Sequence, residues 1–176
     1  MKSSSIKYIV FISFLLGSLI NSGAQNKSKI DFAIHNLGIQ VDGHFNAFNI
    51  KAAFNSKDEL TSVYGSITVN SIKTGIDSRD KHLLKEDYFD ATQHKNILLN
   101  SQSIIKNTDN TYTVKVSLKI KGKSQVLTIP INVVKKDDVC KLISNFQINR
   151  RDFKIGGGSL ILSKTVKINV VHFQKL

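Results

Sequence analysis

The sequence predicts an all-β protein, an antiparallel eight-stranded β-barrel with one short helix between its early and late strands. Apolar and polar residues alternate with a period of two through most of the chain, which is the pattern of half-buried strands. Clusters of turn-forming residues separate the alternating segments at short intervals. Only one segment breaks the alternation, so these observations favour a barrel, or a strongly coiled sandwich, over a parallel α/β fold.

The early strands precede the helical segment. Ile30, Phe32 and Ile34 share one face of the first alternating segment, and a bend at Leu37-Gly38 leads into the next. A polar turn then separates two further segments. We expect the early strands at residues 29–34, 39–45, 50–54 and 63–69.

The helix is expected within residues 74–90, TGIDSRDKHLLKEDYFD. Asp77 or Ser78 can accept hydrogen bonds from the first free backbone N–H groups. Asp80 lies in the first turn, where negative charge is favourable, and Leu83 begins an apolar edge that would pack on the sheet. The helix would plug the barrel.

The late strands follow the helix. In the clearest of them, apolar residues from Val114 to Ile120 occupy one face and lysines or serine the other. Pro130, the only proline, lies opposite the apolar face of its segment, which argues for an edge position or a bulge. We expect the late strands at residues 97–105, 114–120, 127–133, 140–148 and 166–172.

The amino terminus has the pattern of a signal peptide. Lys2 and Lys7 precede an apolar run over residues 8–20, and small residues end at Ala24. We expect cleavage near Ala24, which assigns residues 1–24 to the signal peptide and 25–176 to a single domain in the periplasm or outside the cell. An uncleaved membrane anchor is the alternative, and the absence of a cysteine after the run argues against a lipoprotein.

Cysteine content and charge limit the functional classes. Cys140 is the only cysteine, so no intramolecular disulfide can form, and we expect a buried, inert thiol. The formal charge is +12, and loss of Lys2 and Lys7 would leave 12 − 2 = +10. The lysines are dispersed over the strands, which is typical of solvated strand faces. Contact of this basic surface with an anionic membrane or polymer stays open, and no nucleic-acid partner is expected.

Four segments, in order, resemble the YceI-like family of periplasmic polyisoprenoid-binding proteins. Residues 34–48 resemble its early "H-L-G-V…G-x-F…F" segment, and IDSRDKHL with DYFD at residues 76–90 resembles its helical signature. LKIKG at residues 118–122 and INRRDF at residues 148–153 resemble two later motifs. The departures are Lys95 for a usual proline and Val116 and Lys154 for usual glycines, which indicate a divergent member.

The resemblance implies a lipocalin-like barrel with a hydrophobic tunnel for an isoprenoid chain, without catalysis. About eight strands is the size at which a barrel can hold one ligand. The resemblance also makes Arg79, Asp80 and His82 a candidate polar cluster that fixes the helix as a lid. The expected tunnel wall consists of Phe32, Ile34, Phe45, Phe48, Phe54, Ile67, Val69, Phe89, Leu118, Ile120, Phe146 and Ile148.

Other chemistry finds little support. None of the five histidines has a metal-ligand spacing, so no metal site, cofactor or catalytic residue is expected. Residues 156–158 lack the Lys-Ser/Thr of a phosphate loop and are interpreted as a flexible linker. Arg150, Arg151 and Asp152 are either a structural cluster or an anchor for a ligand head group.

The leading hypothesis is an exported, non-enzymatic barrel that holds a polyisoprenoid or isoprenoid-quinone-like amphiphile. The alternative is a basic periplasmic or surface module that binds an anionic polymer or membrane surface and carries no lipid. A third hypothesis is an enzyme that acts on a hydrophobic substrate through Arg79, Asp80 and His82. The ligand's head group and chain length stay open, as does pairing of two barrels in a homodimer.

Overall fold

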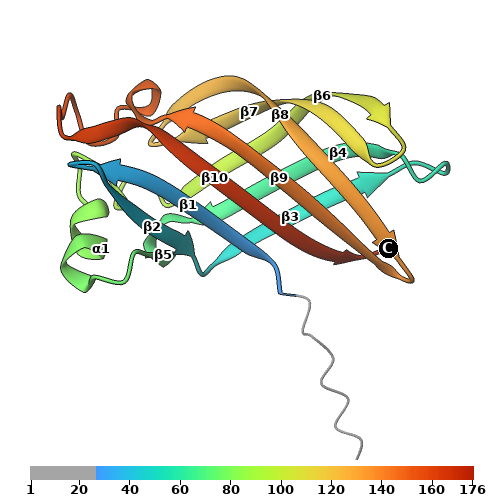
Figure 1. The fold of residues 1–176 in the computed structure, drawn as a ribbon, viewed down its shortest axis with the longest axis horizontal. Coiled ribbons are helices and arrows are strands. Elements are labelled where there is room, and N and C mark those ends of the chain that lie inside the picture. Colours follow the sequence, from blue (N-terminus) through green and yellow to red (C-terminus); the bar gives the residue numbers. More distant parts are fainter. Residues whose placement is uncertain (1–26) are drawn as a thin grey trace, which may run out of the picture.

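A single antiparallel sheet curls around the long axis of the molecule in the computed structural model, which describes residues 27–176 (Figure 1). The order of its strands is β3-β4-β6-β7-β8-β9-β10-β1-β2-β5. The strands are β1 Lys29–Asn36, β2 Ile39–Phe45, β3 Phe48–Phe54, β4 Leu60–Thr68, β5 Ile72–Lys73, β6 Asn96–Thr108, β7 Thr111–Ile120, β8 Lys123–Lys136, β9 Val139–Asn149 and β10 Leu162–Lys175. The helix α1 spans Asp77–Leu83, and two short 3-10 helices span Val69–Ser71 and Arg150–Phe153.

The predicted class is confirmed: antiparallel β with one short helix between early and late strands. The sheet has ten strands rather than the predicted eight: nine lie at the nine alternating segments expected above, and the tenth is β5. The two-residue β5 is too short for a visible alternation, which is why the sequence did not indicate it. The expected signal peptide lies outside the described residues.

The helix is shorter than predicted, because only Asp77–Leu83 is helical within residues 74–90. Ile76 is its N-cap residue, and no side chain in the described chain caps the helix, so the predicted capping by Asp77 or Ser78 is wrong. After Leu83 the chain turns repeatedly and stays close to α1, since the backbone N–H of Phe89 donates to Leu83 O at 3.1 Å.

Alternation decides which side chains enter the barrel. Along β7, Tyr112, Val114, Val116 and Leu118 are buried, and each is followed by a more exposed residue. Two buried clusters result, one near the α1 end and one toward the opposite end. Cys140 belongs to the second cluster, where burial raises the pKa of its thiol against the smaller opposing effect of Lys135. The prediction of a buried cysteine is confirmed.

One strand pair brings an aromatic ring over a glycine. Phe32 in β1 is the cross-strand partner of Gly43 in β2. A Cβ atom at position 43 would lie only 2.3 Å from Cζ of Phe32, so the ring occupies the space that any larger residue would need. Gly43 therefore allows close packing of the two strands.

The two end strands of the sheet, β3 and β5, are not paired with each other in the strand order. A side chain bridges the edge of β3 instead. The amide of Gln174, near the end of β10, accepts a hydrogen bond from Ala52 N at 3.0 Å and donates one to Ala52 O at 2.9 Å. This pair satisfies backbone groups that a neighbouring strand would otherwise have satisfied.

Pro130 does not lie on an edge strand, because β8 runs between β7 and β9. Its segment is nevertheless a local edge: the β8–β9 ladder extends only from Asn132 to Lys136. Beyond it, Ser144 Oγ donates a hydrogen bond to Pro130 O at 2.6 Å. Proline has no N–H to donate, and Pro130 lies in a part of β8 where β9 forms no ladder hydrogen bonds, so its missing N–H interrupts no bond to β9.

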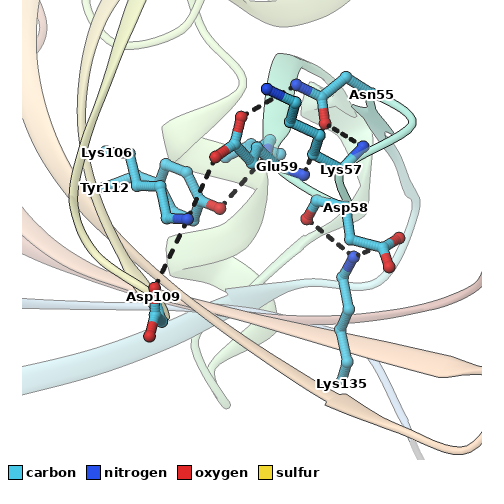
Figure 2. A network of polar contacts seen from close by, with 9 residues as sticks. Asn55, Lys57, Asp58, Glu59, Lys106, Asp109, Tyr112 and Lys135 are labelled. Carbon is cyan, nitrogen blue, oxygen red and sulfur yellow. Dashed lines mark hydrogen bonds and ion pairs between the residues drawn. The ribbon is translucent and has the colours of Figure 1, made fainter.

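A polar network ties hairpins together at the end opposite α1 (Figure 2). Lys106 Nζ lies 3.2 Å from Glu59 Oε1 and 3.6 Å from Asp109 Oδ1, and Lys135 Nζ lies 2.9 Å from Asp58 Oδ1. Hydrogen bonding to Asn55 and Lys106 lowers the pKa of Glu59. The β3–β4 turn is thereby joined to β6 and β8.

The α1 end is organised by Arg150, whose side chain is 1% exposed. Its five N–H groups point at five backbone carbonyls of the following loop and the start of β10, those of Ile155, Gly157, Ser159, Leu162 and Ser163, at 2.6 to 3.4 Å. Burial lowers the pKa of Arg150, assisted by the charge of Arg151. The glycine segment is therefore a hydrogen-bonded loop and not the flexible linker that the sequence suggested.

Gly156 joins this loop to the segment after α1. Its N–H donates to Asp87 O at 2.8 Å, and its φ is +64°. A Cβ here would lie 3.0 Å from Tyr88 Cε1 and 3.3 Å from Arg150 Nη1. Both the backbone conformation and the close approach require glycine.

We expect Arg150→Met to destabilise the protein by at least about 3 kcal/mol, because it removes a charged donor set and leaves buried carbonyls without partners. Arg151→Met is the matched control: Arg151 is exposed and makes one side-chain bond, to Ser159 O at 3.0 Å. Its substitution should change the free energy of unfolding by less than about 1 kcal/mol. Urea denaturation measures both, and equal losses would contradict this role of Arg150.

Candidate ligand-binding cavity

An apolar cavity of about 380 Å³ runs through the interior of the barrel. Residues of both buried clusters line it, from Ile72 and Ile155 near α1 to Ile131 and Leu142 toward the other end. Its volume falls within the range of small-molecule sites. Because inward-facing residues alternate with outward ones, the strands themselves supply this continuous apolar wall.

Nine of the twelve predicted wall residues line the cavity: Phe32, Ile34, Phe45, Ile67, Phe89, Leu118, Ile120, Phe146 and Ile148. The other three lie elsewhere. Phe48 packs against the cluster near α1, Val69 is fully buried in that cluster, and Phe54 packs against the second cluster beneath the ammonium group of Lys135. Whether a ligand contacts the nine stays a prediction.

The prediction missed much of the wall. The additional aliphatic residues include Ile30, Leu99, Ile129, Ile131, Val166, Ile168 and Val170. Most of these positions belong to the alternating apolar faces that predicted the strands, so the same signal could have found them. The sequence prediction favoured aromatic residues and therefore included Phe48 and Phe54, which do not line the cavity.

Within residues 27–176, no hydrogen bond or ion pair joins the side chains of the three residues in the predicted polar cluster. Arg79 and Asp80 meet at Thr74: Arg79 donates to Thr74 Oγ1 at 2.8 Å and to Thr74 O at 2.6 Å, while Asp80 Oδ1 accepts from Thr74 N at 2.8 Å and from Thr74 Oγ1 at 2.6 Å. His82 instead packs its ring edge-to-face against Tyr88, with centroids 4.9 Å apart.

Asp80 is the buried member of this lid. Burial alone would raise the pKa of Asp80, but the hydrogen bonds from Thr74 and the charge of Lys73, whose Nζ lies 3.6 Å away, hold the pKa below its usual value. Arg79, His82, Thr74 and Tyr88 line the cavity. The lid therefore presents polar groups at one end of a mostly apolar space.

A second polar feature lies at the far part of the wall, where the buried His172 lines the cavity from β10. Its Nδ1 shares a hydrogen bond of 3.1 Å with Ser28 Oγ, which also accepts from Phe173 N at 2.9 Å. Nε2 is buried and has no hydrogen-bond partner within residues 27–176. Burial lowers the pKa of His172 against a smaller opposing effect of the Gln174 amide.

Metal chemistry finds no support in the described chain. Within residues 27–176, His, Cys, Asp and Glu side chains do not gather in any group of three that could hold a metal ion. None of the helices in this part of the chain is both long and apolar enough to cross a membrane.

The fold and the cavity define a lipocalin-like barrel with an apolar interior and a short helix at one end. The family model of the YceI-like domain matches residues 23–172. The chain therefore belongs to the YceI-like family, and the resemblance in the sequence motifs is confirmed.

Individual relatives are distant. The chain is 27% identical over 111 residues to a UPF0312 protein of Pectobacterium atrosepticum and 23% identical over 104 residues to one of Vibrio cholerae. These matches cover 62% and 58% of the chain but only 57% and 55% of the relatives, so the chain spans about half the length of the curated relatives it matches.

Solved structures share the fold at low identity. BcnA of Burkholderia cenocepacia has a TM-score of 0.79 at 23% identity, covering 84% of this chain and 96% of that one. A polyisoprenoid-binding domain from Saccharophagus degradans, implicated in plant cell wall breakdown, has a TM-score of 0.69 at 16% identity, covering 85% and 94%. At these identities the likeness establishes the fold alone.

We expect Asp80→Ala to destabilise the protein by about 1–3 kcal/mol, because the Thr74 N–H loses its acceptor. The contribution of the carboxylate is present above its unfolded pKa of about 4 and is lost as pH falls through the lowered folded value. Urea denaturation at neutral pH measures the loss. Asp77→Ala, at an exposed helical position, is the control, and an equal effect there would contradict this role of Asp80.

His172 should make the protein less stable in mild acid. Because its folded pKa is lowered, the unfolded chain binds the proton more readily, so stability decreases as pH falls below about 6.5. Thermal denaturation between about pH 7.5 and 5 should show this slope in the wild type and a smaller one in His172→Gln. An unaltered slope in His172→Gln would refute the assignment.

Proposed function

We propose that this protein binds an isoprenoid or similar long amphiphile in the barrel and does not act as an enzyme. The observation that carries the proposal is the continuous apolar cavity, lined along its length by aliphatic and aromatic side chains. Membership of the YceI-like family and the polyisoprenoid-binding neighbour from Saccharophagus degradans support the choice of ligand.

The arrangement of polar groups suits an amphiphile. The lid contributes a guanidinium, an imidazole and a phenol at one end of the cavity, from Arg79, His82 and Tyr88. Arg79 has Nη1 uncommitted to any hydrogen bond within residues 27–176, since its bonds to Thr74 use Nε and Nη2. A polar head group would lie among these residues, while the apolar tail would extend along the barrel.

Energetics indicate a carrier. Burying a tail of about forty carbons at roughly 0.8 kcal/mol per methylene is worth on the order of 30 kcal/mol relative to water. No non-covalent complex is that tight. A membrane is therefore the relevant competitor, because the tail is already removed from water there, and the net preference for the barrel is only a few kcal/mol. Such a balance allows both loading and release.

The proposal includes export to the periplasm or beyond the cell, on the strength of the signal-peptide pattern. The quinone-like character of the head group is likewise part of the proposal. Mass measurement of the protein isolated from its native host tests cleavage near Ala24.

Lipid extraction tests the proposal directly. The protein is purified from its native host and extracted with organic solvent, and the extract is analysed by mass spectrometry. A stoichiometric polyprenyl species is expected. An extract with no lipid above that of an unrelated exported protein, together with failure to load added isoprenoid quinones, would refute lipid binding and favour the basic interaction module, whose polyanion binding would weaken with salt.

Narrowing the cavity should remove the ligand while keeping the fold. We expect Val170→Trp, on the cavity wall, to reduce co-purified lipid at least severalfold at a stability cost of about 1–3 kcal/mol. Val126→Trp, at a half-exposed aliphatic position on β8, is the matched control and should keep its lipid. Full lipid content in folded Val170→Trp would contradict the cavity as the binding site.

A further inference from the structure

We propose that the α1 end of the barrel docks on an anionic lipid bilayer through four aliphatic side chains, Leu37, Ile39, Leu160 and Ile161, which we term the mouth patch. This inference rests on the proposed function, because a lipid carrier must reach a membrane. The existence of the mouth patch, however, follows from observations that do not depend on that function.

The mouth patch is exposed to an unusual degree. Relative exposure is 69% for Leu37, 71% for Ile39, 98% for Leu160 and 55% for Ile161. Single exposed aliphatic residues are common on protein surfaces, but a contiguous group indicates an interaction site. These four come from two segments distant in sequence, the β1–β2 turn with the first residue of β2, and the loop before β10.

A backbone hydrogen bond joins the two segments. Leu37 N donates to Ile161 O at 2.9 Å, and the adjacent residues Asn36 and Leu162 are partners in the β1–β10 register. Asn36 and Leu162 both line the cavity. The mouth patch therefore borders the cavity wall, at the end of the barrel that carries α1 (Figure 1).

Leu37 violates the usual chemistry of its turn. It has φ +51° and Gly38 has φ +79°, the pattern of a two-residue turn in which both central residues are left-handed. Asparagine or glycine is favoured at such a first position, and a leucine is disfavoured there by its Cβ. The side chain of Leu37 thus combines a disfavoured backbone conformation with exposure to solvent, which points to a role outside the fold.

The outward orientation of Leu160 and Ile161 is built into the loop. Arg150 binds the carbonyls of Ser159 and Leu162 on either side of this pair, at 3.4 and 2.8 Å. The backbone is thus held from the interior while the two side chains remain outside. Collapse of the pair into the apolar cavity would break these bonds to a buried charge.

Charge favours an anionic bilayer as the partner. Exposed Arg151, Lys154 and Lys164 flank the Leu160-Ile161 pair in sequence, and the one acid in the same stretch, Asp152, accepts a hydrogen bond from Asn149 Nδ2 at 3.0 Å. Aliphatic side chains that enter the interface, together with nearby cations that contact anionic head groups, are the two components of peripheral membrane binding.

Vesicle flotation tests the inference. The protein used begins at Gln25, which retains every described strand and excludes the apolar run at residues 8–20 that would itself enter a bilayer. It is floated with vesicles of phosphatidylglycerol and phosphatidylcholine. We expect Leu37→Asn and Leu160→Asn each to weaken binding roughly tenfold, and added salt to weaken the binding of the wild type.

The variants separate docking from folding. Leu37→Asn suits the turn, so its thermal midpoint should equal or exceed that of the wild type while its vesicle binding falls. Ile105→Asn, which alters an aliphatic residue 62% exposed on β6, should leave binding unchanged. The inference is overturned if the wild type does not float, if Ile105→Asn weakens binding as much as the mouth-patch variants, or if those variants instead dissociate a dimer.

Lipid extraction of the same proteins distinguishes the two proposals. Vesicle binding that depends on the mouth patch supports docking even if no lipid is extracted, in which case the carrier function fails alone. Stoichiometric lipid without vesicle binding refutes docking and leaves the carrier function standing.

Discussion

The buried guanidinium of Arg150 is the interaction on which the open end of the barrel depends. A charge removed from water is costly unless all of its donors are satisfied, and here five carbonyls satisfy them without a carboxylate among the described residues. The loop before β10 is consequently wrapped around the charge. Through Gly156, the same loop contacts Tyr88 and the segment after α1, so one side chain fixes both the rim and the lid of the cavity.

The two ends of the barrel differ in a way that gives the cavity a direction. At the end away from α1, the second buried cluster surrounds the cavity, and ion pairs among Glu59, Lys106 and Asp109 join the hairpins on the outside. At the α1 end the arrangement is the opposite: the lid directs polar groups into the cavity, and the rim exposes aliphatic side chains to solvent. The three most exposed large apolar side chains of the described residues, Leu160, Ile39 and Leu37, all lie on this rim, where a bilayer could receive them.

Sequence patterns predicted the features that depend on periodicity. Alternation located the long strands and most of the cavity wall, because the face of each residue follows from its position along a strand. Features that depend on specific polar contacts could not be predicted. Gln174 bridges to Ala52 across 122 residues, and Asp80 accepts from Thr74 rather than stabilising the first turn as a surface charge. The motif that contains Arg150 is visible in the sequence, but the partners of its guanidinium are backbone carbonyls, which every residue has and no sequence pattern distinguishes.

The exposed rim and the apolar interior follow from one thermodynamic condition. If a long lipid tail is nearly as stable in the bilayer as in the barrel, the affinity of the barrel for the lipid contributes little to function. The rate at which lipid exchanges between barrel and bilayer then becomes decisive. Passage of the tail through water would cost the full hydrophobic free energy, whereas transfer at the membrane surface avoids it. A carrier therefore gains from aligning the cavity mouth with the bilayer, even at the expense of a strained leucine and an apolar loop tip that folding alone would not favour.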